Sequence, residues 1–294
     1  MGKFWNIIGL LIVFIAMYIA YTARNTFDPE SIRGKRVVVT GASTGIGEKV
    51  AYQYAKLGAN ILITARREIR LKQVVKKCLE LGAQSAHYIS LDMQVINETG
   101  KLITEAEKIL GGLDYLVLNH AIYNMKLWDG DIERLHALMN INFVSYVNLA
   151  TKALPMLSTS NGSIAVVSSG TGLFSLPGAV SYSASKHALN GFFEGLRLEL
   201  KYKEIDVAVT LLLLGGITTD HVIDMLPNRD TLAHFGDPTE AASFIVKATS
   251  SKQTWAYYPW VGVRTMEIIH TISRDLIHVM IANWFFPMLR ILKI

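Results

Sequence analysis

Short β-branched runs alternate with segments of helical periodicity from Arg36 onward. This alternation is typical of βαβ units, in which a parallel sheet is covered by helices on both faces. Seven strands are predicted, at residues 36–40, 60–65, 86–91, 115–118, 163–168, 207–213 and 255–258. We therefore expect an α/β fold with a doubly wound, seven-stranded parallel sheet of Rossmann type.

The first 24 residues follow a different pattern. Residues 4–21 are an almost uncharged apolar run between Lys3 and Arg24, about as long as a helix that crosses ~30 Å of hydrocarbon. We expect a transmembrane anchor over residues 1–24. A cleaved signal peptide is disfavoured because no polar segment with a small-x-small cleavage site follows. A buried core helix is disfavoured because the strand pattern begins only near Lys35.

Residues 261–294 form a second unusual segment. They are rich in Ile, Leu, Met, Trp and Phe, but too many charges interrupt them for a membrane span. The charged and titratable residues are Arg274, Asp275, His278, Arg290 and Lys293. The pattern predicts an amphipathic C-terminal segment that contacts either the membrane or a second subunit.

The length of 294 residues fits one α/β domain between these two ends, at residues 25–260. Within this domain, residues 216–237 contain Pro227 and Gly236 and are typical of a mobile loop or lid.

The formal charge of +5 is spread along the chain, so no nucleic-acid partner is expected. The single cysteine, Cys78, excludes an internal disulfide and a Cys-rich zinc site, and no metal site is predicted.

Two features bear on the side of the membrane. The cations Lys3 and Arg24 lie on opposite sides of the apolar run, and the second is followed by charges of both signs, so the positive-inside rule gives no orientation. Two glycosylation sequons, Asn97-Glu98-Thr99 and Asn161-Gly162-Ser163, are compatible with a lumenal domain.

A glycine-rich loop, residues 40–47, follows the first strand and precedes a helix predicted from Glu48 to about Leu57. A pyrophosphate binds helix N-terminal N–H groups at this place in dinucleotide-binding folds. Gly41 permits the tight turn, Gly45 lets the backbone approach the phosphates, and Gly47 allows the helix to pack closely on the sheet.

The end of the second strand indicates which dinucleotide binds. An acidic residue there would bind the ribose hydroxyls, whereas the chain has Arg66 and Arg67 and no carboxylate. An arginine can clamp a phosphate with two N–H groups, so we expect NADP(H), with Arg66 as the main contact and Ser43 as a helper. Arg67 is either a second contact or a solvated charge. Three residues at the ends of the third and fourth strands are expected on the adenosine side, namely Asp92, Asn119 and Ala121.

Tyr182 and Lys186 are spaced i, i+4 at the start of a helical pattern, so their side chains share one helix face. A neighbouring ammonium favours the ionised form of a phenol whose ordinary pKa is ~10, which makes the pair suited to acid-base catalysis. Ser169, at the end of the fifth strand, is placed to hold a substrate carbonyl oxygen. Asn142, within a predicted helix over residues 138–149, is expected to order a water beside Lys186.

These residues resemble the short-chain dehydrogenase/reductase family over about residues 35–258. The motifs are Thr40-Gly41-x-x-x-Gly45-x-Gly47, Asn119-His120-Ala121, Asn142, Ser169 and Tyr182-x-x-x-Lys186. Within the family, the anchor and the runs at residues 78–83, 85–89, 153–157 and 161–164 are similar to the 11β-hydroxysteroid dehydrogenase type 1 and type-1-like group.

The resemblance implies reversible oxidation of a secondary alcohol on a steroid or similar lipophile. It also implies a homodimer anchored in the endoplasmic reticulum membrane with its catalytic domain in the lumen. The implied cofactor contacts include Thr44, Ile46, His120, Ile217 and Thr219, besides Tyr182 and Lys186. The implied substrate contacts are Ser169, Tyr182, Leu176 and Gly216.

At some positions this sequence differs from the 11β-hydroxysteroid dehydrogenase type 1 and type-1-like group. Thr44 replaces a basic residue of that group, which leaves a 2′-phosphate more dependent on Arg66. Leu176 stands where the mammalian type 1 enzyme has an aromatic residue, and Gly216 where it has a leucine. Two alternatives therefore stay open: a reductase of retinoids, keto-lipids or xenobiotic carbonyls with the same fold, and a nucleotide-binding scaffold without turnover.

Overall fold

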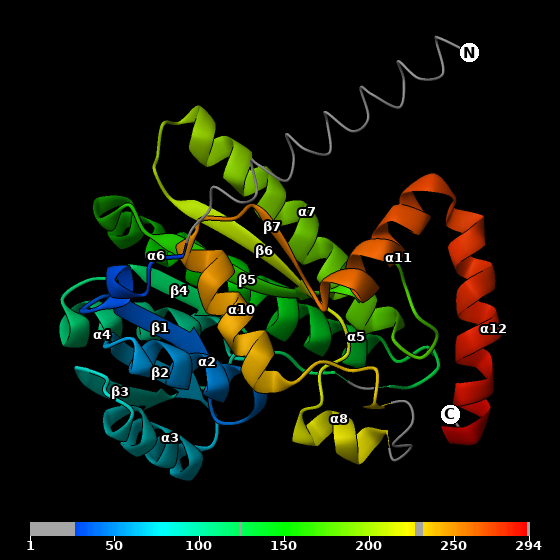
Figure 1. Ribbon diagram of the computed structural model, residues 1–294, viewed down its shortest axis with the longest axis horizontal. Coiled ribbons are helices and arrows are strands. Elements are labelled where there is room, and N and C mark those ends of the chain that lie inside the picture. The colour runs from blue at the N-terminus through cyan, green and yellow to red at the C-terminus, as the bar shows by residue number, and fades with distance from the viewer. Residues whose placement is uncertain (1–26, 124, 227–231, 293–294) are drawn as a thin grey trace.

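The computed structural model describes residues 27–292, apart from residue 124 and residues 227–231. One parallel sheet runs through the domain in the order β3-β2-β1-β4-β5-β6-β7 (Figure 1). The strands are β1 (Arg36–Thr40), β2 (Asn60–Ala65), β3 (Ser85–Ser90), β4 (Tyr115–Leu118), β5 (Ser163–Ser169), β6 (Ala208–Leu214) and β7 (Trp255–Tyr258). The predicted seven-stranded, doubly wound sheet is confirmed, and every strand boundary is right to within one residue.

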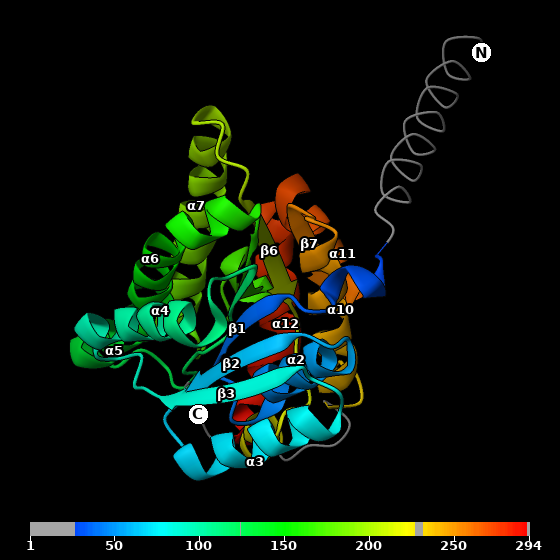
Figure 2. The same cartoon turned by 90° about the vertical axis from the view of Figure 1, so that its left-hand side faces the viewer.

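Helices cover both faces of the sheet, as Figure 2 shows edge-on. One face carries α2 (Gly45–Lys56), α3 (Glu68–Glu80) and α10 (Pro238–Ser250), and the other carries α4 (Ile96–Leu110), α6 (Ser145–Ser160) and α7 (Val180–Tyr202). Successive strand residues point to opposite faces, so Val37 and Val39 belong to one core and Val38 to the other. Both cores consist of buried apolar side chains packed between the sheet and its helices.

Short elements and the last two helices complete the described chain. They are η1 (Pro29–Ile32), α5 (Ile132–Met139), the π-helical turn η2 (Asn140–Val144), η3 (Gly170–Gly172), α8 (Asp220–Met225), α11 (Trp260–Ile272) and α12 (Arg274–Leu292). The segment predicted as a loop or lid contains the helix α8, and its two ends meet in a bridge between Ile217 and Gly236.

The predicted amphipathic C-terminal segment consists of α11, which packs beside β7, and α12, which packs against α11 (Figure 1). Several of their apolar side chains face outward, with Val261 71% and Ile272 78% exposed. Among the residues that the structure describes, no helix has the length and apolar character needed to cross a bilayer. The predicted anchor at residues 1–24 lies outside the described residues.

An ion pair joins β1 to β4 at the amino edge of the sheet. The Asp114 carboxylate accepts hydrogen bonds from the backbone N–H of Arg36 at 2.8 Å and from its Nε at 2.7 Å. Burial raises the pKa of Asp114, but the hydrogen bonds from Arg36 outweigh it and hold the pKa below its usual range. The pair therefore stabilises the junction of these two strands, on whose opposite ends the candidate site is built.

Replacing Asp114 by Asn should lower the free energy of unfolding by ~2 kcal/mol at neutral pH, because a charge-assisted hydrogen bond is lost from a buried position. A carboxyl whose folded pKa is depressed stabilises the fold above its unfolded pKa of ~4, and this contribution is lost as the pH falls through the folded value. Urea unfolding of wild type and variant should therefore differ at pH ~7 and converge in acid. Asp206→Asn is the control, since that carboxylate is exposed. If the difference in the free energy of unfolding between wild type and Asp114→Asn does not change with pH, Asp114 does not stabilise the fold through its ionised carboxylate.

Candidate active site

Three side chains converge where β5 ends and α7 begins. Ser169 is the last residue of β5, Tyr182 lies in the first turn of α7, and Lys186 follows one turn later. The Ser169 hydroxyl oxygen accepts hydrogen bonds from the backbone N–H and the hydroxyl of Thr171, at 3.2 and 3.0 Å. The structure thus brings together the three residues that the sequence predicts for proton transfer, at the carboxyl edge of the sheet.

Lys186 is enclosed by protein. Only 1% of its surface is exposed, and its Nζ donates to the carbonyl oxygen of Val167 at 2.9 Å. The same nitrogen lies 5.6 Å from the ring centre of Tyr182 and 5.5 Å from that of Tyr146. Burial lowers the pKa of Lys186 to about 7, so both its charged and its neutral forms are accessible near neutral pH.

Tyr182 shows a pKa shift opposite to the expected one. Burial, followed by repulsion from Tyr123, raises the pKa of Tyr182 above its ordinary value, while the neighbouring Ser169 hydroxyl opposes the rise. Lys186 was expected to lower this pKa, but in the chain alone the loss of water around the phenol dominates. Tyr182 is therefore a protonated phenol at neutral pH, in the form that donates a proton.

Asn142 is fully buried and lies in the π-helical turn η2 rather than in regular α-helix. Its amide oxygen accepts from the Ile122 N–H at 2.8 Å, and its amide nitrogen donates to the Ile122 carbonyl at 2.9 Å and to the Ser185 hydroxyl at 3.3 Å. The side chain predicted to order a water therefore clasps the segment that follows β4 and ties it to α7.

The glycine loop has the geometry that a dinucleotide requires. Gly41 and Gly45 have φ angles of +67° and +62°, which side chains rarely adopt. A Cβ added to Gly47 would lie 2.4 Å from the Gly41 carbonyl oxygen and 2.5 Å from Nδ2 of Asn119. The helix α2 begins at Gly45, and the Thr44 side chain does not cap it, so backbone N–H groups at its N-terminus are available for phosphate.

A cluster of hydrogen bonds fixes this loop to the end of β4. The Thr40 hydroxyl accepts from the Asn119 N–H at 2.9 Å, and Nδ2 of Asn119 donates to the Thr40 carbonyl at 3.2 Å. The His120 ring contacts the Thr40 hydroxyl at 2.8 Å and the Ser145 hydroxyl at 2.6 Å. Burial, aided by Lys186, lowers the pKa of His120 to about 3, so its ring is neutral. The side chains of Asn119 and His120 thus brace the loop, and Ala121 is exposed at the edge.

The two arginines after β2 have different surroundings. Nη2 of Arg67 donates to the hydroxyls of Ser43 at 3.0 Å and Thr44 at 2.7 Å, which places its guanidinium over the glycine loop. Arg66 is exposed, and the structure gives its side chain no hydrogen-bond partner among the described residues. Asp92, after β3, accepts from the Gln94 N–H at 3.0 Å. Arg67 therefore shares the predicted 2′-phosphate region with Ser43, and Arg66 keeps its whole guanidinium available.

The segment that follows β6 packs against the glycine loop at Gly45. A Cβ on Gly45 would meet the Thr219 methyl group at 3.3 Å, and Ile217 is a buried member of the core against which Ile46 packs. A Cβ on Gly216 would lie 2.6 Å from the ring of Phe235, so this aromatic ring fills the space beside the glycine. The sequence alone gives no sign of Phe235 at this place, because the contact joins residues 19 positions apart across a segment of loop and helix.

A third apolar cluster, separate from the two cores, lies beside Tyr182. It includes the predicted substrate residue Leu176 together with Tyr123 and Phe235, which the sequence analysis did not single out, and Ile281 from α12. We refer to it as the side-pocket cluster. Only the fold could reveal it, since its members come from four distant parts of the chain.

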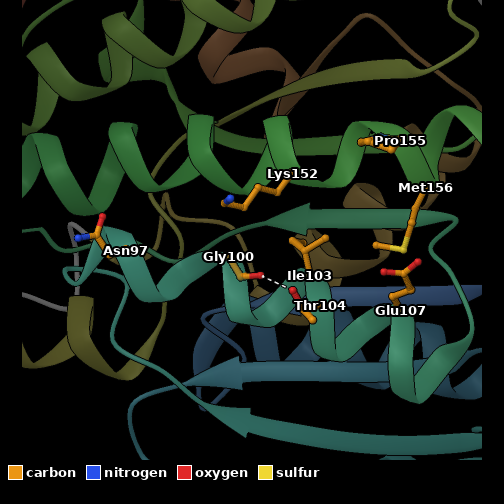
Figure 3. Close-up of a pocket in the computed structure, with 8 residues that line it drawn as sticks. All are labelled: Asn97, Gly100, Ile103, Thr104, Glu107, Lys152, Pro155 and Met156. Carbon is orange, nitrogen blue, oxygen red and sulfur yellow. Dashed lines mark hydrogen bonds between the residues drawn. The ribbon is translucent and has the colours of Figure 1, made fainter.

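A separate groove of about 390 Å³ lies between α4 and α6 (Figure 3). It is lined by Asn97, Gly100, Ile103, Thr104, Glu107, Lys152, Pro155 and Met156. None of the predicted catalytic or nucleotide-binding residues belongs to it. The asparagines of the two sequons, Asn97 and Asn161, are both exposed, whereas the hydroxyl residues Thr99 and Ser163 are buried.

Residues 35–230 match the sequence model described as short chain dehydrogenase. The chain is 46% identical over 242 residues to the Hydroxysteroid 11-beta-dehydrogenase 1-like protein of Xenopus tropicalis, which covers 82% of this chain and 84% of the relative. Proteins with the same description from Gallus gallus and Danio rerio are 46% and 47% identical over 247 and 238 residues, covering 84% and 80% of this chain and 86% and 82% of the relatives.

Proposed function

The chain belongs to the short-chain dehydrogenase family of oxidoreductases, and on this premise we propose that it uses NADP(H) to interconvert a secondary alcohol and a ketone on a steroid or similar lipophilic substrate. The observation behind the proposal is the convergence of Ser169, Tyr182 and Lys186 at the sheet edge that also holds the glycine loop. In open α/β sheets, ligands bind at this edge.

The chain's own residues handle the proton. Ser169 is oriented by Thr171 and holds the substrate oxygen where charge develops. Tyr182, protonated at neutral pH, gives its phenolic proton to that oxygen during reduction and takes it back during oxidation. Lys186 offers three donors but has one acceptor among the described residues, so it keeps hydrogen-bonding capacity for the cofactor ribose and for the proton path beside Tyr182.

The residues present fit a dinucleotide. The tight approach of Gly47 to Gly41 and the free N-terminus of α2 form a cradle that a larger residue would fill. A dinucleotide held by this cradle would supply or accept the hydride at its nicotinamide. Arg66 and Arg67, with Ser43 and Thr44, would hold the 2′-phosphate, which is why we favour NADP(H) over NAD(H).

The substrate class rests on the side-pocket cluster and on the relatives. Apolar side chains next to Tyr182 suit a lipophilic alcohol or ketone better than a charged one. The relatives' descriptions name a hydroxysteroid, so steroids are the first compounds to test.

We further propose that residues 1–24 anchor a homodimer in the endoplasmic reticulum membrane, with the catalytic domain in the lumen. The exposed apolar side chains of α11 and α12 are available to contact the membrane or the second subunit. The exposure of Asn97 and Asn161 allows a lumenal domain to carry glycans without disturbing the fold.

The Tyr182→Phe variant should lose about 10²- to 10⁴-fold in turnover, because the proton donor is removed while the ring stays in place. Turnover is measured as NADPH consumed with a panel of keto-steroids, retinals and small ketones, and NADPH binding is measured separately and should not change. Tyr202→Phe, at the exposed end of α7, is the matched control. A Tyr182→Phe variant that reduces ketones at the wild-type rate would contradict the proposal, and NADPH binding without any turnover by wild type would favour a scaffold.

Arg66→Ala should weaken binding of NADPH at least about tenfold while leaving NADH binding nearly unchanged, because only NADPH has the phosphate that an arginine can clamp. Arg67→Ala should produce a smaller loss, since Arg67 also bonds Ser43 and Thr44. Titration by fluorescence measures the dissociation constants of NADPH and NADH for wild type and for both variants. Equal losses for the two dinucleotides would count against NADP(H) selectivity by these residues.

The lumenal placement predicts protection from protease added to intact microsomes and a loss of apparent mass after endoglycosidase treatment. The mass change should disappear in the Asn97→Gln, Asn161→Gln double variant. Complete digestion of the catalytic domain in intact microsomes would show that it faces the cytosol instead.

A further inference from the structure

Tyr123 is the closest aromatic neighbour of the proposed proton donor. The ring centres of Tyr123 and Tyr182 are 4.7 Å apart, and the planes meet at 73°, an edge-to-face arrangement. Tyr123 is partly exposed, in the segment between β4 and α5. Its ring therefore forms part of the wall beside the reacting phenol.

Two anchors hold Tyr123 in this place. The Asn142 amide clasps the N–H and the carbonyl of the preceding residue, Ile122, at 2.8 and 2.9 Å. The Tyr123 carbonyl itself contacts Nε2 of His221 in α8 at 3.3 Å. Because the backbone on both sides of the Tyr123 side chain is hydrogen bonded, little conformational entropy is lost when this side chain contacts a ligand.

The phenolic hydroxyl of Tyr123 has no hydrogen-bond partner among the described residues, although the ring belongs to the side-pocket cluster. Burial raises the pKa of Tyr123, so the group stays protonated and can donate. The ring packs in the same apolar cluster as Leu176, Phe235 and Ile281, whose side chains cannot accept the proton. A polar group with this environment is satisfied by water or by a ligand.

We propose that Tyr123 is a specificity-determining residue whose hydroxyl donates a hydrogen bond to a second oxygen of the substrate, distinct from the one that reacts. In the proposed mechanism the reacting oxygen already has Ser169 and Tyr182, so the hydroxyl of Tyr123, whose ring packs edge-to-face against that of Tyr182, is assigned to another part of the molecule. The substrate class is then a lipophilic ketone or alcohol with an additional hydroxyl or carbonyl group. This inference rests on the proposed function and narrows its substrate.

The expected substrate preference arises because it costs free energy to leave the Tyr123 hydroxyl without a hydrogen-bond acceptor when a substrate binds. A substrate with an acceptor at the right place satisfies the Tyr123 hydroxyl, whereas one without it displaces water from that hydroxyl and leaves it unpaired. The Phe235 ring over Gly216 and the Leu176 side chain offer shape but no polarity, so they cannot make this distinction.

The experiment compares the Tyr123→Phe variant with wild type, using the full-length chain in detergent with NADPH. Substrates are keto-steroids with a hydroxyl at different ring positions, each paired with its deoxy analogue. For at least one pair, the variant should lose about 3- to 10-fold in kcat/KM for the hydroxylated ketone and change little for the deoxy analogue, as expected for one neutral hydrogen bond. Binding of NADPH should stay unchanged, and Tyr202→Phe should behave as wild type on every substrate.

Thermal shift with the same pairs separates this inference from the proposed function. If wild type consumes no NADPH with any ketone, the proposed function fails. The role of Tyr123 would still be supported if a hydroxylated ligand raises the melting temperature of wild type more than its deoxy partner does. This difference should then be lost in Tyr123→Phe. If wild type reduces the ketones but Tyr123→Phe changes both members of every pair equally, or if wild type distinguishes no pair, the inference is wrong and the proposed function stands.

Discussion

The hydroxyl of Thr40 is the point on which the candidate site depends. It donates to the Val117 carbonyl at 3.1 Å and accepts from the Asn119 N–H, so it joins the carboxyl ends of β1 and β4 where the strand order reverses. The segment that follows β1 is the glycine loop, and the segment that follows β4 contains Tyr123. This buried hydroxyl thus adds hydrogen bonds to the backbone pairing of β1 and β4 and ties the start of the glycine loop to the segment after β4.

Tyr146 links this junction to Lys186, one of the residues proposed to transfer the proton. The Tyr146 hydroxyl donates to the His120 carbonyl at 2.6 Å, and the Tyr146 ring lies 5.5 Å from Nζ of Lys186. A neutral His120 is necessary here, because a second buried cation near Lys186 would be costly. Burial therefore acts on all three groups in one direction: it favours the neutral phenol, the neutral imidazole and a lysine that loses its proton near pH ~7.

The proposed substrate side of the site is assembled differently from the nucleotide side. The nucleotide region is built from adjacent strands and the turns that follow them, whose geometry is dictated by the sheet. The side-pocket cluster instead joins the segments after β4 and β5, the region around α8 and the helix α12, none of which is a strand of the sheet. Such elements can vary without disturbing the core, which is how one fold accommodates many substrates.

The sequence by itself determined the sheet, the glycine loop and the residues proposed to move the proton, because strand periodicity, glycine spacing and the i, i+4 pair are local patterns that can be read without knowledge of the fold. It did not determine the environment of those residues. The raised pKa of Tyr182, the clasp of Asn142 on Ile122 and the place of Arg67 over Ser43 all depend on which side chains exclude water or meet across the sheet edge. Tyr123 and Phe235 could be found only in the tertiary structure, since burial and long-range contact leave no periodic signal in the chain.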